Sequence, residues 1–282
     1  MLIHSDSELR SFLPNALVTV EGEMSLFEKL SSYLTEAETW LATFITGAAP
    51  LAAITAENEG ANRPLCCRIV VCHALIHAIP SLDLVLTPNG FGIVSNQNIA
   101  PASRDRVDRL IGSIEMQRDD AIILLQKQFF RRTDWHQSEV FGYWAQTLLP
   151  NISVCHQLQI REHRFMAYRA LVPRIIQIED ELAHSFISPE LLAYLHTYQF
   201  GIGYAELSPA EQSGRAYVLT HLQAEIVSQL SGQPIRHRYM SDLVNVIRSQ
   251  PDIFPLWHSS DTARLFTPPI FQNKKDAQGY FF

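Results

Sequence analysis

The sequence predicts a mainly α-helical protein, built of helical bundles with one short β-hairpin near residues 84–94. Apolar residues recur at steps of three and four through most of the chain, as expected for helices with one buried face. One segment instead places an Asn-Gly pair between two apolar runs, which is the strongest short-range signal for a hairpin. With 282 residues, 47% of them hydrophobic, the chain is long enough for a sizeable core in one or two domains.

Two helices are expected near the N-terminus. Ser5 and Glu8 match a capping box, and the short helix that follows ends before Pro14. Ser25 and Glu28 form a second box at the start of a longer helix, for which Gly47 is a natural end. Its apolar stripe consists of Phe27, Leu30, Leu34, Ala37, Leu41 and Phe44.

Two more long helices follow. Pro64 is tolerated in the first turn of the third helix, which ends at Pro80. Its buried face is expected to be Leu65, Ile69, Cys72, Ile76 and Ile79. Ser103 caps the fourth helix, which reaches Phe130. Its inner face is Val107, Leu110, Ile111, Ile114, Ala121 and Leu125, and its other face carries Arg104, Arg106, Arg109 and Asp119.

The predicted hairpin joins Leu84–Leu86 to Phe91–Val94. A two-stranded hairpin is marginal in water, so it must pack on a helix or pair with a strand of another chain. We therefore expect the loop from Thr87 to Ala102 to be an interaction element; the alternative is that it covers the core of its own chain. The candidate interaction residues are Pro88, Asn89, Gly90, Phe91, Asn96, Gln97 and Asn98.

We expect a helical domain with the hairpin over residues 1–130 and a second helical region over 131–282. Helices are predicted at 139–149, 174–186, 189–198, 208–230 and 240–247, with Pro173 limiting the second of these. Thr39–Ile45 resembles Glu181–Ile187, and each precedes a short helix. Either a diverged internal repeat or a chance similarity between amphipathic helices explains this resemblance.

The chain ends in an extended tail that is rich in Pro and aromatic residues. Tyr280, Phe281 and Phe282 follow a polar stretch, and each aromatic side chain can bury about 150–250 Å² in full contact. We expect these three residues to anchor the tail, either to the body of the same chain or to a neighbouring subunit.

Composition limits the partners. A net charge of −7 makes the chain a poor general binder of nucleic acid, which is held mainly by Lys and Arg. The N-terminus lacks the basic start and apolar run of a signal peptide, and the apolar stretch Ile69–Pro80 is too short to span a bilayer. Cytoplasm is the expected compartment, with no membrane partner.

No catalytic constellation is recognisable. His73 and His77 are spaced as two ligands of one metal, but the glutamate of the zinc-protease helix is missing between them, so we expect no metal. Cys66 and Cys67 are adjacent and point to different sides of a helix. Phosphate-binding glycine loops and nucleophile elbows are also missing. We expect neither a cofactor nor an enzyme.

The stretch from Ile79 to Val107 contains the segment LVLTPNGFGIVSNQNIAPAS followed by Asp105-Arg106-Val107. It resembles a family of uncharacterised proteins encoded in prophages of Bacteroides and relatives, in which a similar segment joins two helices. The resemblance covers residues 1–130. Members of that family look like the small helical head–tail connector proteins of tailed phages, which assemble as rings between portal and tail.

Two functions follow from these expectations. The first is a virion structural protein, a connector or adaptor that assembles with itself and with portal or tail components. The alternative is an intracellular binding or regulatory protein encoded by the prophage and without catalysis. Gel filtration with light scattering separates the two, because an oligomer favours the first.

Overall fold

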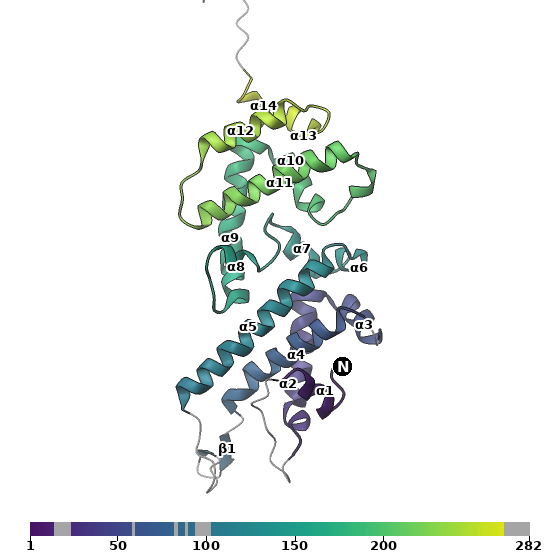
Figure 1. The fold of residues 1–282 in the computed structure, drawn as a ribbon, viewed down its shortest axis with the longest axis vertical. Helices are drawn as coiled ribbons and strands as arrows, with labels where there is room; N and C mark the ends of the chain where they lie inside the picture. Colours follow the sequence, from purple (N-terminus) through teal and green to yellow (C-terminus); the bar gives the residue numbers. More distant parts are fainter. Residues whose placement is uncertain (14–23, 58–59, 82–83, 88–89, 94–102, 268–282) are drawn as a thin grey trace, which may run out of the picture. The chain divides into compact units, whose positions relative to one another are not determined.

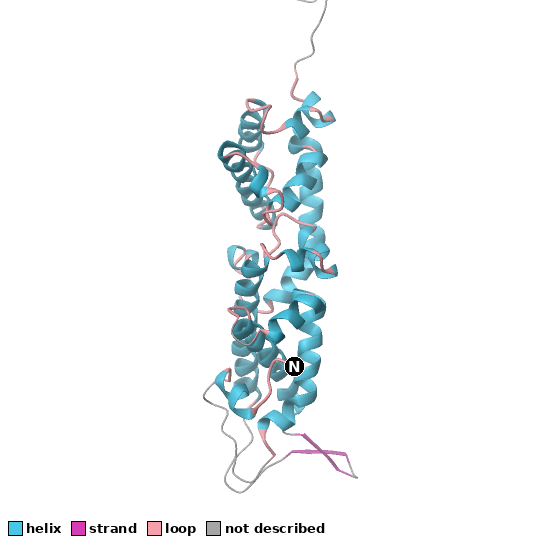
Figure 2. Cartoon of the chain, turned by 90° about the vertical axis from the view of Figure 1, so that its right-hand side faces the viewer, coloured by secondary structure: helices cyan, strands magenta, loops and turns pink. Residues whose placement is uncertain are grey.

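In a computed structural model of the protein, residues 1–13, 24–57, 60–81, 84–87, 90–93 and 103–267 are described. This part of the chain is mainly α-helical, which confirms the predicted fold class. It forms two compact units, Met1–Pro173 (unit 1) and Arg174–Phe282 (unit 2). The helix α9 (Arg164–Leu182) contains the boundary. Figures 1 and 2 show the elements of each unit.

Unit 1 contains most of the long helices. In chain order the elements are α1 (Asp6–Ser11), α2 (Leu26–Leu41), η1 (Ala42–Thr46), α3 (Ala48–Ala56), α4 (Arg63–Ala78), η2 (Ile79–Ser81), β1 (Leu84–Thr87), β2 (Gly90–Ile93), α5 (Arg104–Phe129), α6 (Thr133–His136), α7 (Glu139–Ala145) and α8 (Val154–Gln157). The start of α9 completes the unit. Both predicted N-terminal caps are present, at Ser5 for α1 and as a full capping box at Ser25 for α2.

Unit 2 begins within α9. It continues with η3 (Ala183–Ile187), α10 (Pro189–Tyr198), η4 (Tyr204–Glu206), α11 (Pro209–Leu230), α12 (His237–Arg248), α13 (Pro255–His258) and α14 (Asp261–Arg264). The start of α11 agrees with the prediction, because Ser208 and Glu211 form a capping box with Pro209 at the first helical position.

The helix α4 is the centre of unit 1. It packs against α2 on one side and α5 on another, and it is buried nearly all round rather than along the predicted stripe. Val70, Val71 and Ala74, outside that stripe, are as buried as Ile69 and Cys72. By length and composition Arg63–Ser81 is also apolar enough to cross a membrane, although 56% of its apolar window is buried inside the protein.

The two strands run antiparallel, with Leu84 opposite Ile93 and Thr87 opposite Gly90, and Figure 2 draws them in magenta. Residues 88–89 and 94 of the predicted hairpin lie outside the described residues. Whether this ladder is a stable element of the fold therefore stays a prediction.

Two helix boundaries differ from the prediction. Pro173 lies inside α9 instead of before a helix. The helix continues through it because Tyr168, Val172, Ile175 and Ile178 are all buried on one face, and this packing outweighs the lost backbone bond. The helix α7 ends at Ala145 rather than at Leu149, because Leu148 and Leu149 are buried from a non-helical stretch.

The similar segments Thr39–Ile45 and Glu181–Ile187 lie where two long helices end. The helices α2 and α9 both end in a five-residue π-helical turn, η1 and η3. Each turn is closed by a backbone bond to its first residue, from Gly47 N to Ala42 O at 2.9 Å and from Ser188 N to Ala183 O at 2.8 Å. Gly47 and Ser188 both have positive φ, at 79° and 81°, and each starts a short helix.

The likeness continues beyond the π turns. In both units the π turn is followed by a short helix, two longer helices and a short Trp-His helix, α6 or α13. Trp135 donates its indole N–H to Ile45 O at 3.0 Å, and Trp257 donates to Phe186 O at 2.8 Å. Both acceptors are the fourth residue of a π turn. The helices α4 and α5 of unit 1 thus correspond in order to α11 and α12 of unit 2.

The first compact unit extends beyond residue 130, where we expected a domain boundary. The indole N–H groups of Trp135 and Trp144 each donate to a carbonyl of η1, Ile45 O and Phe44 O, at 3.0 Å. These bonds join α6 and α7 to the end of α2. Residues 131–173 are therefore part of the first helical bundle.

Candidate functional site

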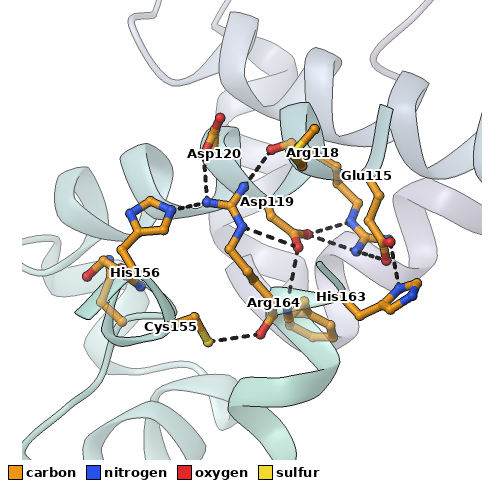
Figure 3. Close-up of polar contacts among 12 residues, drawn as sticks. Glu115, Arg118, Asp119, Asp120, Cys155, His156, His163 and Arg164 are labelled. Carbon is orange, nitrogen blue, oxygen red and sulfur yellow. Dashed lines mark hydrogen bonds and ion pairs between the residues drawn. The ribbon is translucent and has the colours of Figure 1, made fainter. Parts of the chain in front are cut away.

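The most concentrated group of charges in the described residues is a buried ionic network in unit 1, built by α5, α8 and α9 (Figure 3). Its centre is Asp119 on α5, whose side chain is 1% exposed. Its Oδ1 accepts from Arg118 Nε at 2.9 Å and Nη2 at 2.8 Å, and its Oδ2 accepts from the backbone N–H of Phe165 at 3.3 Å. Asp119 therefore joins the middle of α5 to the first turn of α9.

Arg164, the first residue of α9, is the second cation of the network. Its side chain is 4% exposed and pairs with Asp120 at 2.8 Å, while its Nε lies 4.0 Å from Asp119. Its guanidinium also donates to Met116 O at 2.8 Å and contacts His156 on α8. One arginine thus connects α9 to the neighbouring α8 and to α5, which is distant in the sequence.

Glu115 forms the outer edge of the network. One carboxylate oxygen accepts from Arg118 at 3.1 Å, and the other lies 2.7 Å from Nδ1 of His163, whose side chain is 71% exposed. Solvent reaches the network at His163 and at Asp120, whose side chain is 61% exposed.

The electrostatics of the network indicate a structural role. Burial raises the pKa of the Asp119 carboxyl, and the neighbouring Arg118 opposes this rise. Two buried cations share the carboxylates of Glu115, Asp119 and Asp120, so the charges are nearly balanced. Removing one member of such a network leaves an uncompensated charge in the core, which is strongly unfavourable. The network therefore fixes the packing of α5 against α8 and α9.

The cysteine thiols are poorly suited to nucleophilic chemistry. All four cysteines are free and buried. Burial raises the pKa of Cys66 to about 12 and that of Cys155 to about 11. Cys155 donates its thiol to Arg164 O at 3.4 Å, beside the network. A thiol with so high a pKa holds almost no thiolate at neutral pH.

His73 lies in a cleft of about 500 Å³ that borders the network. Its ring stacks on Trp40 with centroids 4.1 Å apart, and Arg118 covers the same indole at 5.7 Å. Burial, followed by the charges of Arg118 and His77, lowers the pKa of His73 to about 3. Its Nδ1 is buried without a hydrogen-bond partner. His73 is thus a neutral stacking group at physiological pH.

His77 adjoins His73, with ring centroids 4.5 Å apart. Within the part of the chain that the structure describes, no three His, Cys, Asp or Glu side chains are arranged to hold a metal ion. The residues around the pair favour aromatic stacking on Trp40 over coordination.

Most residues predicted to make interactions lie outside the described ranges. These are Pro88, Asn89, Asn96, Gln97, Asn98, Tyr280, Phe281 and Phe282. Gly90 and Phe91 are placed in β2, opposite Thr87 and Leu86. The interaction role of this set stays a prediction.

Sequence patterns did not indicate the ionic network. Asp119 was assigned to the polar face of its helix, yet it is buried together with Arg118. The available signal was the run Arg118-Asp119-Asp120, which interrupts the apolar stripe of α5 between Ile114 and Ala121. The partner Arg164 is far along the chain, so no local pattern could reveal the pairing.

Residues 24–143 match the model of a protein family described as a family of unknown function, DUF6712. The match extends from α2 into α7, so it contains Asp119 but not Arg164. Neither the curated proteins nor the solved structures gave a match to this chain. The comparisons therefore relate part of unit 1 to a family whose function is unknown.

Proposed function

We propose that the protein is a structural component of a phage or prophage virion, a head–tail connector or adaptor that assembles as an oligomer in the host cytoplasm and in the particle. Its partners would be further copies of itself and portal or tail components. Support comes from the resemblance of residues 79–107 to the prophage family and from one feature of the fold, the long connection between α4 and α5.

That connection is much longer than its counterpart in unit 2. The helix α11 ends at Leu230 and α12 starts at His237, so Ser231–Arg236 is enough to join the corresponding helices there. In unit 1 the helices α4 and α5 are joined by residues 79–103, which include both strands. A connection of this length is not needed to link two packed helices. An additional role, such as binding a neighbouring subunit, accounts for it.

The two strands offer a physical basis for such binding. A two-stranded ladder leaves the outer backbone groups of both strands unpaired, and these can pair with a strand of another chain. Residues 82–102 would then make the subunit contact, with the helices of unit 1 as a rigid base. The tail residues Tyr280, Phe281 and Phe282 are proposed as a second contact.

The test is to replace residues 82–102 by a short Gly-Ser linker. We expect the variant to keep its helical circular dichroism signal and thermal midpoint but to lose the oligomer in gel filtration with light scattering. As a matched control, Gly232–Pro234 in the corresponding connection of unit 2 is replaced by Gly-Ser residues, which should leave the oligomer intact.

Two results would contradict the proposal. An unfolded variant would make the connection a structural cover of unit 1, and an unchanged oligomer would remove its assembly role. A wild-type protein that stays monomeric, alone and with purified portal or tail proteins, would favour the alternative of an intracellular binding or regulatory protein.

A further inference from the structure

A second cleft in unit 1, of about 670 Å³, lies beside the π turn η1. Its walls come from η1, the start of α3, the start of α7 and the first turns of α9. The aromatic side chains that line it are Phe44, Tyr143 and Phe165, and the small residues Gly47, Ala48 and Ala49 line it as well. This volume is in the range of pockets that bind small ligands or single side chains.

Arg169 on α9 is the cation of this cleft. Its guanidinium carbon lies 4.8 Å from the ring centre of Phe44 and 6.0 Å from that of Phe165. The two rings meet edge to face with centroids 6.4 Å apart. A guanidinium held over aromatic faces is restricted in orientation, and its N–H groups lie in the plane of the guanidinium. The Arg169 side chain hydrogen-bonds Tyr143, and an arginine has further N–H groups with which to bind a ligand.

The other buried or half-buried arginines all have a carboxylate partner. The pairs are Arg63–Glu8, Arg118–Asp119, Arg132–Asp134, Arg164–Asp120 and Arg215–Glu211. Arg169 is half-buried and makes no ion pair among the described residues, although Glu139 lines the same cleft. Its neighbour Tyr143 lacks a charge to balance it, because burial raises the pKa of the phenol.

We propose that this cleft binds an organic carboxylate, with its apolar or aromatic part between Phe44, Phe165 and Tyr143 and its carboxylate on Arg169. The planar N–H fork of arginine matches the two oxygens of a carboxylate, and such charge-assisted pairs are about twice as strong as neutral hydrogen bonds. The ligand is either a free small molecule or an acidic residue of a peptide segment. This site is independent of the proposed assembly role.

Unit 2 provides an internal comparison. Phe44 is the third residue of η1, and the third residue of η3 is Ser185, an exposed polar side chain. The backbone turn is shared, but at this position of the turn unit 1 has an aromatic ring under a guanidinium and unit 2 has Ser185.

The full-length protein is titrated with 3-phenylpropanoate, with 3-phenylpropanamide as its uncharged match, and with the blocked dipeptide acetyl-Phe-Glu-amide. Calorimetry or the fluorescence of the nearby tryptophans measures binding. We expect at least one carboxylate to bind saturably. The affinity for the amide should be at least about tenfold lower, because the amide cannot form the charge-assisted pair with Arg169. If 3-phenylpropanoate binds more tightly than the dipeptide, the natural ligand is a small molecule. If the dipeptide binds more tightly, the natural ligand is a peptide segment.

Three variants locate the site, each checked for its fold by circular dichroism. Arg169→Gln should weaken the carboxylate about tenfold or more and leave the amide unchanged. Arg169→Lys keeps the charge without the planar fork and should have a smaller effect. Ala49→Phe places a large side chain at a position that lines the cleft and keeps Arg169. It should block both ligands, so it tests the site even if Arg169→Gln fails to fold.

The proposal is overturned if neither carboxylate binds saturably at millimolar concentration. It is also overturned if the amide binds as tightly as the acid, or if Arg169→Gln and Ala49→Phe both bind like the wild type.

Discussion

The two units share their backbone turns but are stabilised by different interactions. Each has a long helix that ends in a π turn, a residue with positive φ, and a tryptophan that donates to the fourth residue of that turn. In unit 1 two buried arginines form a network with the buried Glu115 and Asp119 and the exposed Asp120, and the long connection joins α4 to α5. In unit 2 the corresponding connection is short, and the fully buried Glu225 pairs with Arg236, which is 42% exposed.

The comparison separates the features that both units share from those found in unit 1. Both units share the π turns and the tryptophan bonds, which join the end of a long helix to a later short helix. The network, the two clefts described above and the long connection belong to unit 1. We therefore expect the functional contacts of the protein to be in unit 1, and the following variants test how far the comparison holds.

The largest effect is expected at Asp119. Asp119→Ala leaves Arg118 and Arg164 buried with less compensation, which should reduce the free energy of unfolding by about 3–5 kcal/mol in urea titrations. Glu225→Ala should cost about 1–3 kcal/mol, because Arg236 can turn to water. The control is Asp108→Ala, which removes an exposed carboxylate of the same helix outside the network and should change the free energy of unfolding little. Equal losses for Asp119→Ala and Glu225→Ala would remove the proposed difference between the units.

The residues after the π turns should respond in opposite directions. At Gly47 a Cβ would lie 2.7 Å from Ser138 Cβ, and φ is +79°. Gly47→Ala should therefore destabilise the protein by about 2–4 kcal/mol. Ser188 has a side chain in the same backbone conformation, so Ser188→Gly should relieve strain and stabilise by about 1 kcal/mol, since glycine is nearly as good an N-cap. Thermal unfolding measures both, and a destabilising Ser188→Gly would contradict the argument.

The tryptophan bonds should be equivalent. Trp135→Phe and Trp257→Phe keep an aromatic ring but leave Ile45 O or Phe186 O without its indole donor. Each should cost about 1–3 kcal/mol of unfolding free energy. Denaturant titration of the two variants compares the losses directly. A loss confined to one variant would show that the two contacts, although alike in geometry, differ in strength.

The last prediction concerns pH and unit 1 alone. The pKa of His73 is lowered from 6.5 to about 3 in the folded protein, so between these values the unfolded chain binds more protons than the folded one. Stability contributed by neutral His73 is complete above pH 6.5 and is lost as pH falls, by at most about 1.4 kcal/mol per pH unit. His73→Phe should flatten this slope in urea titrations, while a comparison at pH 8 isolates the packing change. An unchanged slope would show that His73 is not the titrating group.

Local sequence patterns predicted the helices well where the forces are local. The capping box at Ser25 forms as expected, because a cap bonds residues three positions apart. The buried residues Leu30, Leu34, Ala37 and Leu41 follow the predicted stripe of α2 for the same reason. Pro173 was misassigned because the packing that keeps α9 continuous is not visible in a local pattern.

The sequence by itself determined the helical class, the caps at Ser5 and Ser25 and the apolar stripe of α2, because these depend on neighbours within one or two turns. The tertiary structure alone decided the burial of Asp119 against Arg118 and Arg164, and the pairing of each tryptophan with a π turn. These features join residues far apart in the chain, and a buried charge or backbone carbonyl is stable only where a distant partner satisfies it. No periodicity in the sequence records where that partner will be.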